Sequence, residues 1–287
     1  TRRVLARLGS RMDGRAAASS TLARKPAILH NALEAAVEDG HLQQNPMQTV
    51  KSSSVVDASV DPRAVVNPQQ ASALLAAVRE SSPQLEAFFA CIHYAGLRPA
   101  DVLGLTKDRL VSLPKDRAAI ELTGLQQSTA RVWTDDESTR QERPLEHRPE
   151  GATRTAPAPP ELVTTFGDTL ICSQWSSGNL FAARTGEAGR PLSPPYDVTV
   201  GMNTVYRAGI SKSALTEREY HSQLVRRPYD LRHAYVSTWL SAGVSPADIA
   251  APAGHSVRVM LSVHSQQMAD QRARHQAAVD AVLRPED

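Results

Sequence analysis

The sequence predicts a mainly helical α+β fold built from two units, and three observations support this. Apolar residues recur at helical spacing through most of the chain. Short runs typical of β-strands occur only in the middle, near residues 118–122 and 130–133. Residues 51–66 show little periodicity and resemble a linker. We therefore expect a helical unit over residues 1–50 and a larger unit over residues 67–287.

Bulk composition sets the first limits on function. A chain of 287 residues exceeds one ordinary domain, and 41% hydrophobic residues suit a globular protein with a core. No run of 18 apolar residues occurs, so we expect no membrane span. Cys91 and Cys172 lie far apart and form no metal pattern, which favours two ordinary buried thiols in a reducing cytoplasm. The net charge of +2 does not by itself indicate nucleic acid, although 27 of the 32 basic residues are arginine.

The first unit contains one clear helical signal. Apolar residues such as Leu29 and Leu33 recur at helical spacing over residues 20–40, and Gly40 follows as a stop. Six arginines precede or begin this helix within residues 1–24. They are enough to follow a nucleic-acid backbone, and the alternative is a flexible basic tail. The chain starts without methionine, which suggests that it is a piece of a longer product.

The second unit opens with good helix signals. Asn67 is a favourable N-cap and Pro68 a favourable first residue of a helix that runs to about Glu80. A second helix, over residues 84–95, ends at a glycine, and a short third helix follows Pro99.

The rest of the second unit has a less regular pattern. Residues 134–158 are polar and rich in proline, so we expect a long exposed loop or hairpin. Pro252 is expected to interrupt the helix that contains it. Further helices are predicted near residues 160–168, 197–208, 230–242 and 246–251, followed by a C-terminal helical stretch over 257–283.

The first motif is the string Tyr94 to Leu103. A helix stops at Gly96, and Pro99 starts the next helix, so Arg98 is turned outward beside a free helix N-terminus. A guanidinium next to unsatisfied amides favours an anion. The alternative is an exposed arginine that only caps the helix.

The second motif is the string Pro228 to Ser237. Leu231, Tyr235 and residues 238–240 are expected to face the core, and Tyr229 and Arg232 lie three apart on a neighbouring face. A surface salt bridge is the alternative explanation for Arg232.

The third motif is the string Ala253 to Arg258. Gly254 is expected to end one helix and Ser256 to cap the next. His255 lies between them, and His264 follows nine residues later. The alternative for His255 is a capping or core histidine.

In this order and spacing the three strings resemble the catalytic domain of the tyrosine recombinase (phage integrase) family. That family has a GLR box, an LRH box and a GHS box, followed by a nucleophilic tyrosine. The matching strings are AGLRPADVLGL, RPYDLRHAYVSTWLSAGV and AGHSVRVMLSVHSQQ. The resemblance covers about residues 18–270, and within it the chain is similar to integrases of actinobacterial mobile elements. It implies a helical catalytic domain with a small antiparallel sheet, preceded over residues 1–50 by a partial helical (SAM-like) core-binding domain.

The resemblance also implies a chemistry. Tyrosine recombinases break and rejoin DNA by phosphoryl transfer without a metal or cofactor, and two arginines and a histidine hold the scissile phosphate. By position, Arg98 and Arg232 match the arginines and His255 the histidine, while Asp101 matches the acidic residue that supports the first arginine.

Three positions depart from the family pattern. Tyr229 stands where the family usually has a histidine, which is a tolerable change. Glu146 occupies the position expected for the hairpin lysine that acts as general acid. His264 occupies the position of the nucleophilic tyrosine, and no tyrosine occurs after Tyr235. We therefore expect the nucleophile and the general acid to be lost.

The sequence thus predicts a DNA-binding protein of the recombinase family that is deficient in strand cleavage, so its status as an enzyme stays open. Its expected partner is double-stranded DNA, with a second copy or an active relative, in the cytoplasm at the nucleoid. One alternative is an active strand transferase, or a relaxase-like nickase, that uses His264 as nucleophile. Another is a DNA-binding regulator that reuses the fold. Additional DNA contacts are expected from Arg226, Arg227 and Arg258.

Overall fold

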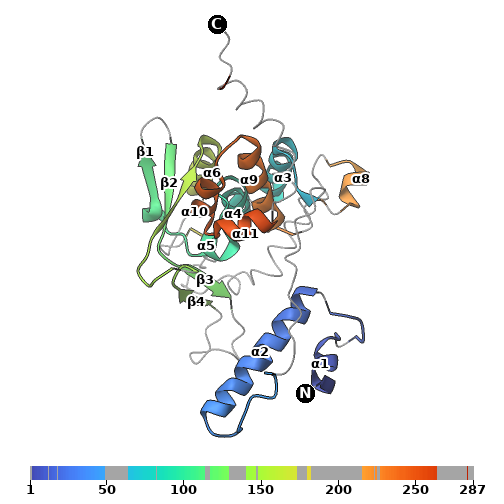
Figure 1. Ribbon diagram of the computed structural model, residues 1–287. Helices are drawn as coiled ribbons and strands as arrows, with labels where there is room; N and C mark the ends of the chain where they lie inside the picture. Colours follow the sequence, from blue (N-terminus) through green and yellow to red (C-terminus); the bar gives the residue numbers. More distant parts are fainter. Residues whose placement is uncertain are drawn as a thin grey trace, which may run out of the picture. The chain divides into compact units, whose positions relative to one another are not determined.

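The computed structural model divides into two compact units, residues Thr1–Ala58 and Ser59–Asp287, which are described separately (Figure 1). The boundary falls within the segment that the sequence suggested as a linker. The structure describes residues 2–11, 13–17, 19–48, 64–81, 83–113, 117–128, 140–146, 148–172, 180–181, 215–222, 224, 227–263 and 283.

The first unit contains two helices, α1 (Arg2–Leu8) and α2 (Ser19–Glu38). The ammonium of Lys25 in α2 donates a hydrogen bond to the carbonyl of Leu8, 3.0 Å away, and so ties the helices together. After α2 the chain reverses at Gly40, which has a φ of +75°. The helix predicted over residues 20–40 is confirmed. The basic start of the chain is in part helical, so it is not simply a flexible tail.

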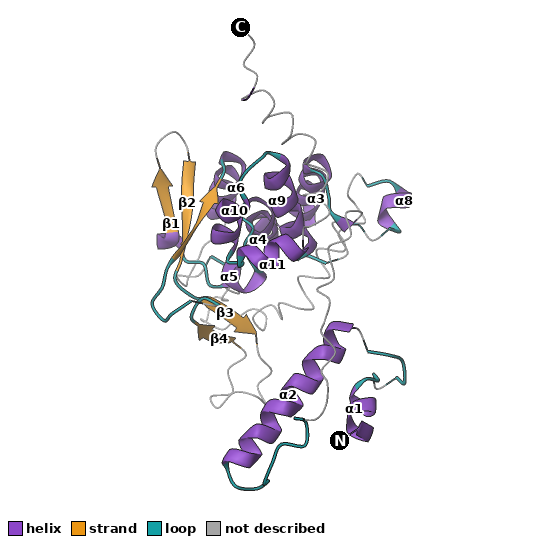
Figure 2. Ribbon diagram, viewed as in Figure 1, coloured by secondary structure: helices purple, strands orange, loops and turns teal. Residues whose placement is uncertain are grey.

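Most of the second unit is helical (Figure 2). Its described helices are α3 (Pro68–Ser81), α4 (Pro83–Tyr94), α5 (Pro99–Leu103), α6 (Pro160–Cys172), α8 (Glu217–Tyr220), α9 (Asp230–Ser241), α10 (Pro246–Ala253) and α11 (Val257–Val263), with a 3₁₀ turn at Lys107–Arg109. None of the described helices in either unit is long and apolar enough to cross a membrane.

Proline and capping side chains explain where these helices begin. Five of the described helices start at proline, whose missing N–H costs nothing in a first turn. At the start of α3, the side chain of Asn67 accepts from the N–H of Gln70 at 2.8 Å, and the side chain of Gln70 accepts from the N–H of Asn67 at 2.9 Å. This reciprocal pair confirms the predicted N-cap at Asn67 and the predicted start of the helix at Pro68.

The strands form two small antiparallel sheets. The first contains β1 (Leu110–Leu113), β2 (Arg117–Leu122) and β5 (Arg154–Ala158) in the order β1-β2-β5. The second pairs β3 (Leu125–Ser128) with β4 (Arg140–Arg143), and β3 packs against α5. The strand predicted near residues 118–122 is therefore confirmed. The strand predicted at 130–133 and the helix predicted at 197–208 lie outside the described residues.

The prediction of a long exposed loop or hairpin over residues 134–158 is wrong at its end. Strand β5 pairs with β2 along its whole length, and Arg154, Ala156 and Ala158 are buried on one side of it. The proline of this strand, Pro157, is tolerated because β5 is an edge strand of its sheet. Small alanines and an arginine in place of large apolar residues hid the strand signal.

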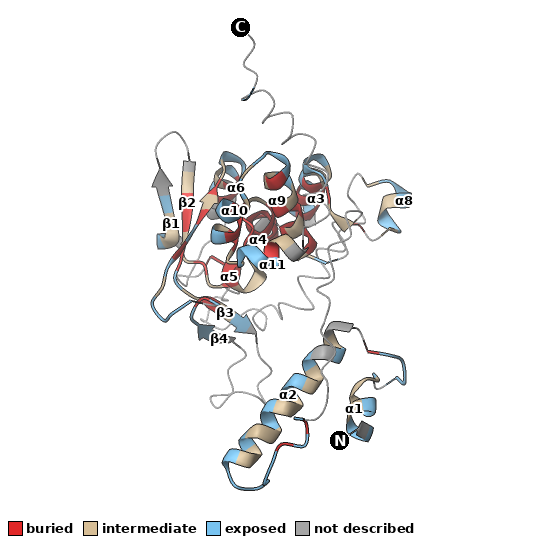
Figure 3. Ribbon diagram, viewed as in Figure 1, coloured by how far each residue is buried: buried red, intermediate tan, exposed pale blue. Residues whose placement is uncertain are grey.

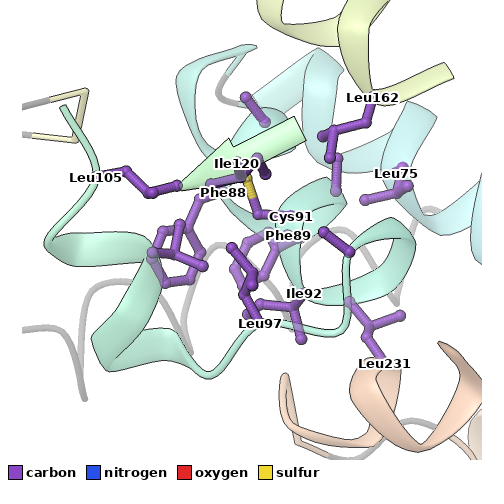
Figure 4. Close-up of a cluster of buried hydrophobic side chains, with 14 of the residues drawn as sticks. Leu75, Phe88, Phe89, Cys91, Ile92, Leu97, Leu105, Ile120, Leu162 and Leu231 are labelled. Atoms are coloured by element: carbon purple, nitrogen blue, oxygen red, sulfur yellow. The ribbon is translucent and has the colours of Figure 1, made fainter. Parts of the chain in front are cut away.

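The core of the second unit surrounds α4. Phe88, Phe89, Cys91 and Ile92 of this helix are essentially inaccessible, and α3, α6 and α9 pack around it (Figure 3). Figure 4 shows these side chains converging with those of Leu75, Leu97, Leu105, Ile120, Leu162 and Leu231. Burial also raises the pKa of the Cys91 thiol, and Cys91 is a buried thiol as predicted.

A smaller apolar cluster joins α9, α10 and α11 through residues such as Tyr235 and Met260. Leu231, Tyr235 and Leu240 are buried as predicted, whereas Thr238 is exposed. Pro252 does not interrupt α10 as expected, because the helix continues to Ala253 and ends at Gly254. A proline in the last turn removes one backbone hydrogen bond without breaking the helix.

Candidate functional site

The turn between α4 and α5 places Arg98. Gly96 takes a φ of +62°, and a side chain there would collide with the ring of Tyr235, since an added Cβ would lie 2.4 Å from its Cδ1. Arg98 is the N-cap residue of α5, and its backbone N–H donates to Oδ2 of Asp101 at 3.0 Å. The turn predicted from the first motif is therefore present, and Asp101 supports Arg98 through the backbone.

The side chain of Arg98 reaches the end of α10. Its Nη2 donates to the carbonyl oxygen of Gly254 at 2.8 Å and lies 3.4 Å from Oε2 of Glu146. The Arg98 side chain is 15% exposed, so the guanidinium is partly accessible. It is thus more than an exposed capping residue, because it connects the GLR and GHS boxes.

A buried ion pair lies beneath this contact. Nη2 of Arg154 on β5 lies 2.6 Å from Oδ2 of Asp101, and the two side chains are 3% and 0% exposed. Asp101 therefore receives both the Arg98 amide and the Arg154 guanidinium on one oxygen. Sequence reasoning missed Arg154 because it placed the residue in an exposed loop. The sequence RTAPA of β5 shows no alternation of large apolar residues, so no local signal indicated this residue.

Gly254 occupies a position that admits no side chain. It ends α10 in the left-handed conformation, with a φ of +67°. An added Cβ would lie 1.7 Å from Nη1 of Arg154 and 3.3 Å from Nη1 of Arg98. Both guanidinium groups therefore lie against this glycine, and Gly254 ends the helix as predicted.

Arg232 is completely buried in α9, so the alternative of a surface salt bridge is wrong. Its two terminal nitrogens donate to the carbonyl oxygens of Gly96 and Ala253, and its Cζ lies 5.8 Å from the centre of the Tyr229 ring. Burial lowers the pKa of the Arg232 guanidinium to about 10, which leaves it cationic at neutral pH. Arg232 thereby connects the GLR, LRH and GHS boxes.

The charges of this region do not balance. Arg98, Arg154 and Arg232 gather around the end of α10. The carboxylates near them are Asp101, which is fully buried and pairs with Arg154, and the half-exposed Glu146 beside Arg98, so three positive charges face two negative ones. Desolvated positive charge that is not compensated is unfavourable. The arrangement therefore favours an anion at the accessible side of the cluster.

A pocket of about 690 Å³ opens on that side. Arg98 and His255, two of the residues matched to the family motifs, line it, and Ser256 caps α11 by accepting from the N–H of Val259 at 3.2 Å. Arg232 is not among the lining residues. The lining residues are Arg98, Glu146, Arg148, Gly254, His255, Ser256 and Val259. Arg148 was overlooked in the sequence, although it stands two residues after Glu146 and is exposed.

Two further candidates, Arg227 and Arg258, are not among the lining residues. Arg227 is exposed and pairs with Asp230 at 3.0 Å, and Arg258 is exposed on α11. Arg226 and His264 lie outside the described residues. Their proposed roles therefore stay predictions.

The second unit has the fold of a tyrosine recombinase catalytic domain, mainly helical with a small antiparallel sheet, and the predicted fold class is confirmed. Among solved structures, the chain is similar to the Tn1549 transposon integrase (residues 82–397) in complex with circular intermediate DNA. The TM-score is 0.64 at 17% identity, over 96% of this chain and 82% of that one. XerA recombinase gives a TM-score of 0.51 at 14% identity, over 96% and 89%.

XerH site-specific recombinase bound to difH substrate gives a TM-score of 0.51 at 13% identity, over 94% of this chain and 69% of that one. At these identities the likeness establishes the fold. By sequence alone, no protein-family model and no curated protein matches the chain.

Proposed function

We propose that this chain is a DNA-binding protein of the tyrosine recombinase family, that its pocket binds a backbone phosphate, and that it does not cleave the strand. One observation carries the proposal: Arg98, Arg154 and Arg232 surround the end of α10, and Asp101, which pairs with Arg154, is the fully buried carboxylate among them. A phosphodiester supplies the missing negative charge, and its oxygens suit the planar donors of arginine.

The lining residues have distinct roles in this proposal. Arg98 binds phosphate oxygens directly because its guanidinium faces the pocket, and His255 is a second donor beside it. Arg232 stays behind the pocket wall and adds positive charge while it fixes the backbone of the turn. Asp101 and Arg154 are positioning residues that hold the turn before α5 against the Gly254 turn.

The proposed partner is double-stranded DNA. The similar integrase and XerH structures hold DNA, which supports this choice. Arg226, Arg227 and Arg258 would contact phosphates beyond the pocket. A second copy of the chain or an active relative would bind the same DNA, and the complex would form in the cytoplasm at the nucleoid. Phosphate contacts position a protein but carry no sequence information directly, so we expect weak selectivity.

The absence of cleavage rests on two positions. His264 takes the place of the family's tyrosine nucleophile in the sequence, and Glu146 brings a carboxylate where a general acid would be needed. A carboxylate beside the phosphate opposes the negative charge that develops during transfer.

Duplex binding with an Arg98→Gln variant tests the phosphate pocket. We expect wild-type affinity for a labelled duplex to fall steeply with salt, and Arg98→Gln to weaken binding about tenfold with a salt slope smaller by about 1. Arg218→Gln, an exposed change on α8, is the matched control. Equal binding by both variants, or no wild-type binding at low salt, would contradict the proposal.

A further inference from the structure

Glu146 places a negative charge inside the pocket proposed for phosphate. Its Oε2 lies 3.4 Å from Nη2 of Arg98, the guanidinium nitrogen that also donates to the carbonyl of Gly254. The Glu146 side chain lines the pocket and is 53% exposed. A carboxylate oxygen thus already lies where an oxygen of a bound phosphate would meet Arg98.

The backbone beside Glu146 is anchored. Leu145 is buried in the main core, and its carbonyl accepts from the N–H of Arg148 at 3.2 Å in a turn that follows β4. The Glu146 side chain therefore starts from a fixed point at the pocket rim. It can turn toward solvent, but its charge stays close to the pocket.

We propose that Glu146 is an internal anion that pairs with Arg98 in the free protein and that DNA phosphate must displace. This inference rests on the proposed function of the pocket. A partly exposed ion pair with 3.4 Å between nitrogen and oxygen contributes little stability, so displacement itself is easy. The carboxylate then remains within a few ångström of the phosphate and repels it. Glu146 therefore lowers the affinity of the pocket and favours DNA that makes several phosphate contacts at once.

The experiment compares Glu146→Gln with Glu150→Gln in the full chain, using a labelled duplex at fixed salt. Both changes remove one negative charge from exposed residues of the same connection, and Glu150 does not line the pocket. We expect Glu146→Gln to bind roughly 3- to 30-fold more tightly than wild type, from the Coulomb energy of like charges a few ångström apart at a protein surface. Glu150→Gln should change affinity by less than about twofold.

A double-mutant cycle with Arg98→Gln separates a local effect from a general change in charge. Phosphate lies beside Glu146 only when Arg98 holds it in the pocket, so removal of Glu146 should improve binding much less in the Arg98→Gln background. A gain of equal size in both backgrounds, or a gain no larger than that of Glu150→Gln, would overturn the inference. Arg98→Lys, which keeps the charge, is a second partner for the cycle if Arg98→Gln unfolds.

The same data distinguish the inference from the proposed function. If Arg98→Gln weakens binding but Glu146→Gln does not strengthen it, the phosphate pocket stands and the internal anion is wrong. If Arg98→Gln binds as well as wild type, the pocket assignment fails, and the internal anion fails with it.

Discussion

The fully buried guanidinium of Arg232 shows where residue-level prediction stops. The sequence could match this residue to a family arginine, but it could not tell a buried cation from one in a surface salt bridge. The difference depends on two carbonyl groups, of Gly96 and Ala253, that come from distant parts of the chain. Arg98 was easier to place, because the glycine and proline on either side of it fix the turn locally.

Gly254→Ala is the sharpest residue-level test of the packed guanidinium groups. We expect it to destabilise the protein by several kcal/mol, since the added Cβ would collide with Arg154 in addition to the strain of a positive φ. Gly243→Ala is the matched control, because Gly243 has a φ of +82° but nothing within 4 Å of its added Cβ. That control should lose only about 1 kcal/mol. The free energy of unfolding in urea measures both, and equal losses would contradict the packing.

His93 predicts a pH dependence of stability. Burial lowers its pKa from 6.5 to about 4, so the unfolded chain binds a proton on this residue more readily than the folded protein does. The free energy of unfolding is therefore unaffected by this residue above pH 6.5. It falls by up to about 3 kcal/mol as the pH drops toward 4, because the unfolded chain takes up the proton first. Urea unfolding of wild type and His93→Gln across this range should show a shallower dependence in the variant. Parallel curves would disprove the assignment.

At the scale of secondary structure, helices were predicted better than strands. Proline at the first position marks the starts of α3, α4, α5, α6 and α10 in the sequence itself. Strand β5 forms because it pairs with β2, and no local sequence pattern indicates that pairing. The error hid Arg154, because a residue assigned to an exposed loop is not considered as part of a buried ion pair.

The capping pair at the start of α3 gives a test at this scale. Asn67→Ala removes the side-chain oxygen that accepts from the Gln70 amide, and we expect a loss of about 1 kcal/mol in unfolding free energy. Ser72→Ala, an exposed change within α3, should be neutral or slightly stabilising because alanine favours helix. A loss from Ser72→Ala as large as that from Asn67→Ala would argue against the cap.

For the whole molecule, the fold followed from three motifs in the right order, although they make up a small part of the chain. Their order is informative because each box contributes a residue to the hydrogen bonds around Gly254. Unrelated folds have no reason to keep that order. The comparison with the Tn1549 integrase covers 96% of this chain and therefore includes residues of both units. Motif spacing predicts the role of a single residue less well than it predicts the fold. The role of His264 is a prediction from the sequence match.

The proposed absence of cleavage concerns the whole site and can be tested by repair. We expect no covalent adduct between the wild-type chain and a nicked suicide duplex, because a histidine side chain is shorter than tyrosine and a positioned acid contributes roughly 10²–10⁴ in rate. His264→Tyr combined with Glu146→Lys should form an adduct where either single change gives little. An acid-labile adduct from wild type, lost in His264→Ala, would instead identify His264 as a working nucleophile.

The burial of Arg232 has a consequence for how such a chain evolves. Arg232 donates to the carbonyl oxygens of Gly96 and Ala253 and so holds the turns at the ends of α4 and α10. Replacing Arg232 would therefore damage folding before it affected any reaction. Selection for a folded protein is then enough to keep the arginine after a lineage stops cutting DNA. The exposed positions of the same site, Glu146 among them, are under no such constraint. Decay of an ancestral activity should therefore begin at the pocket rim and leave the interior signature intact.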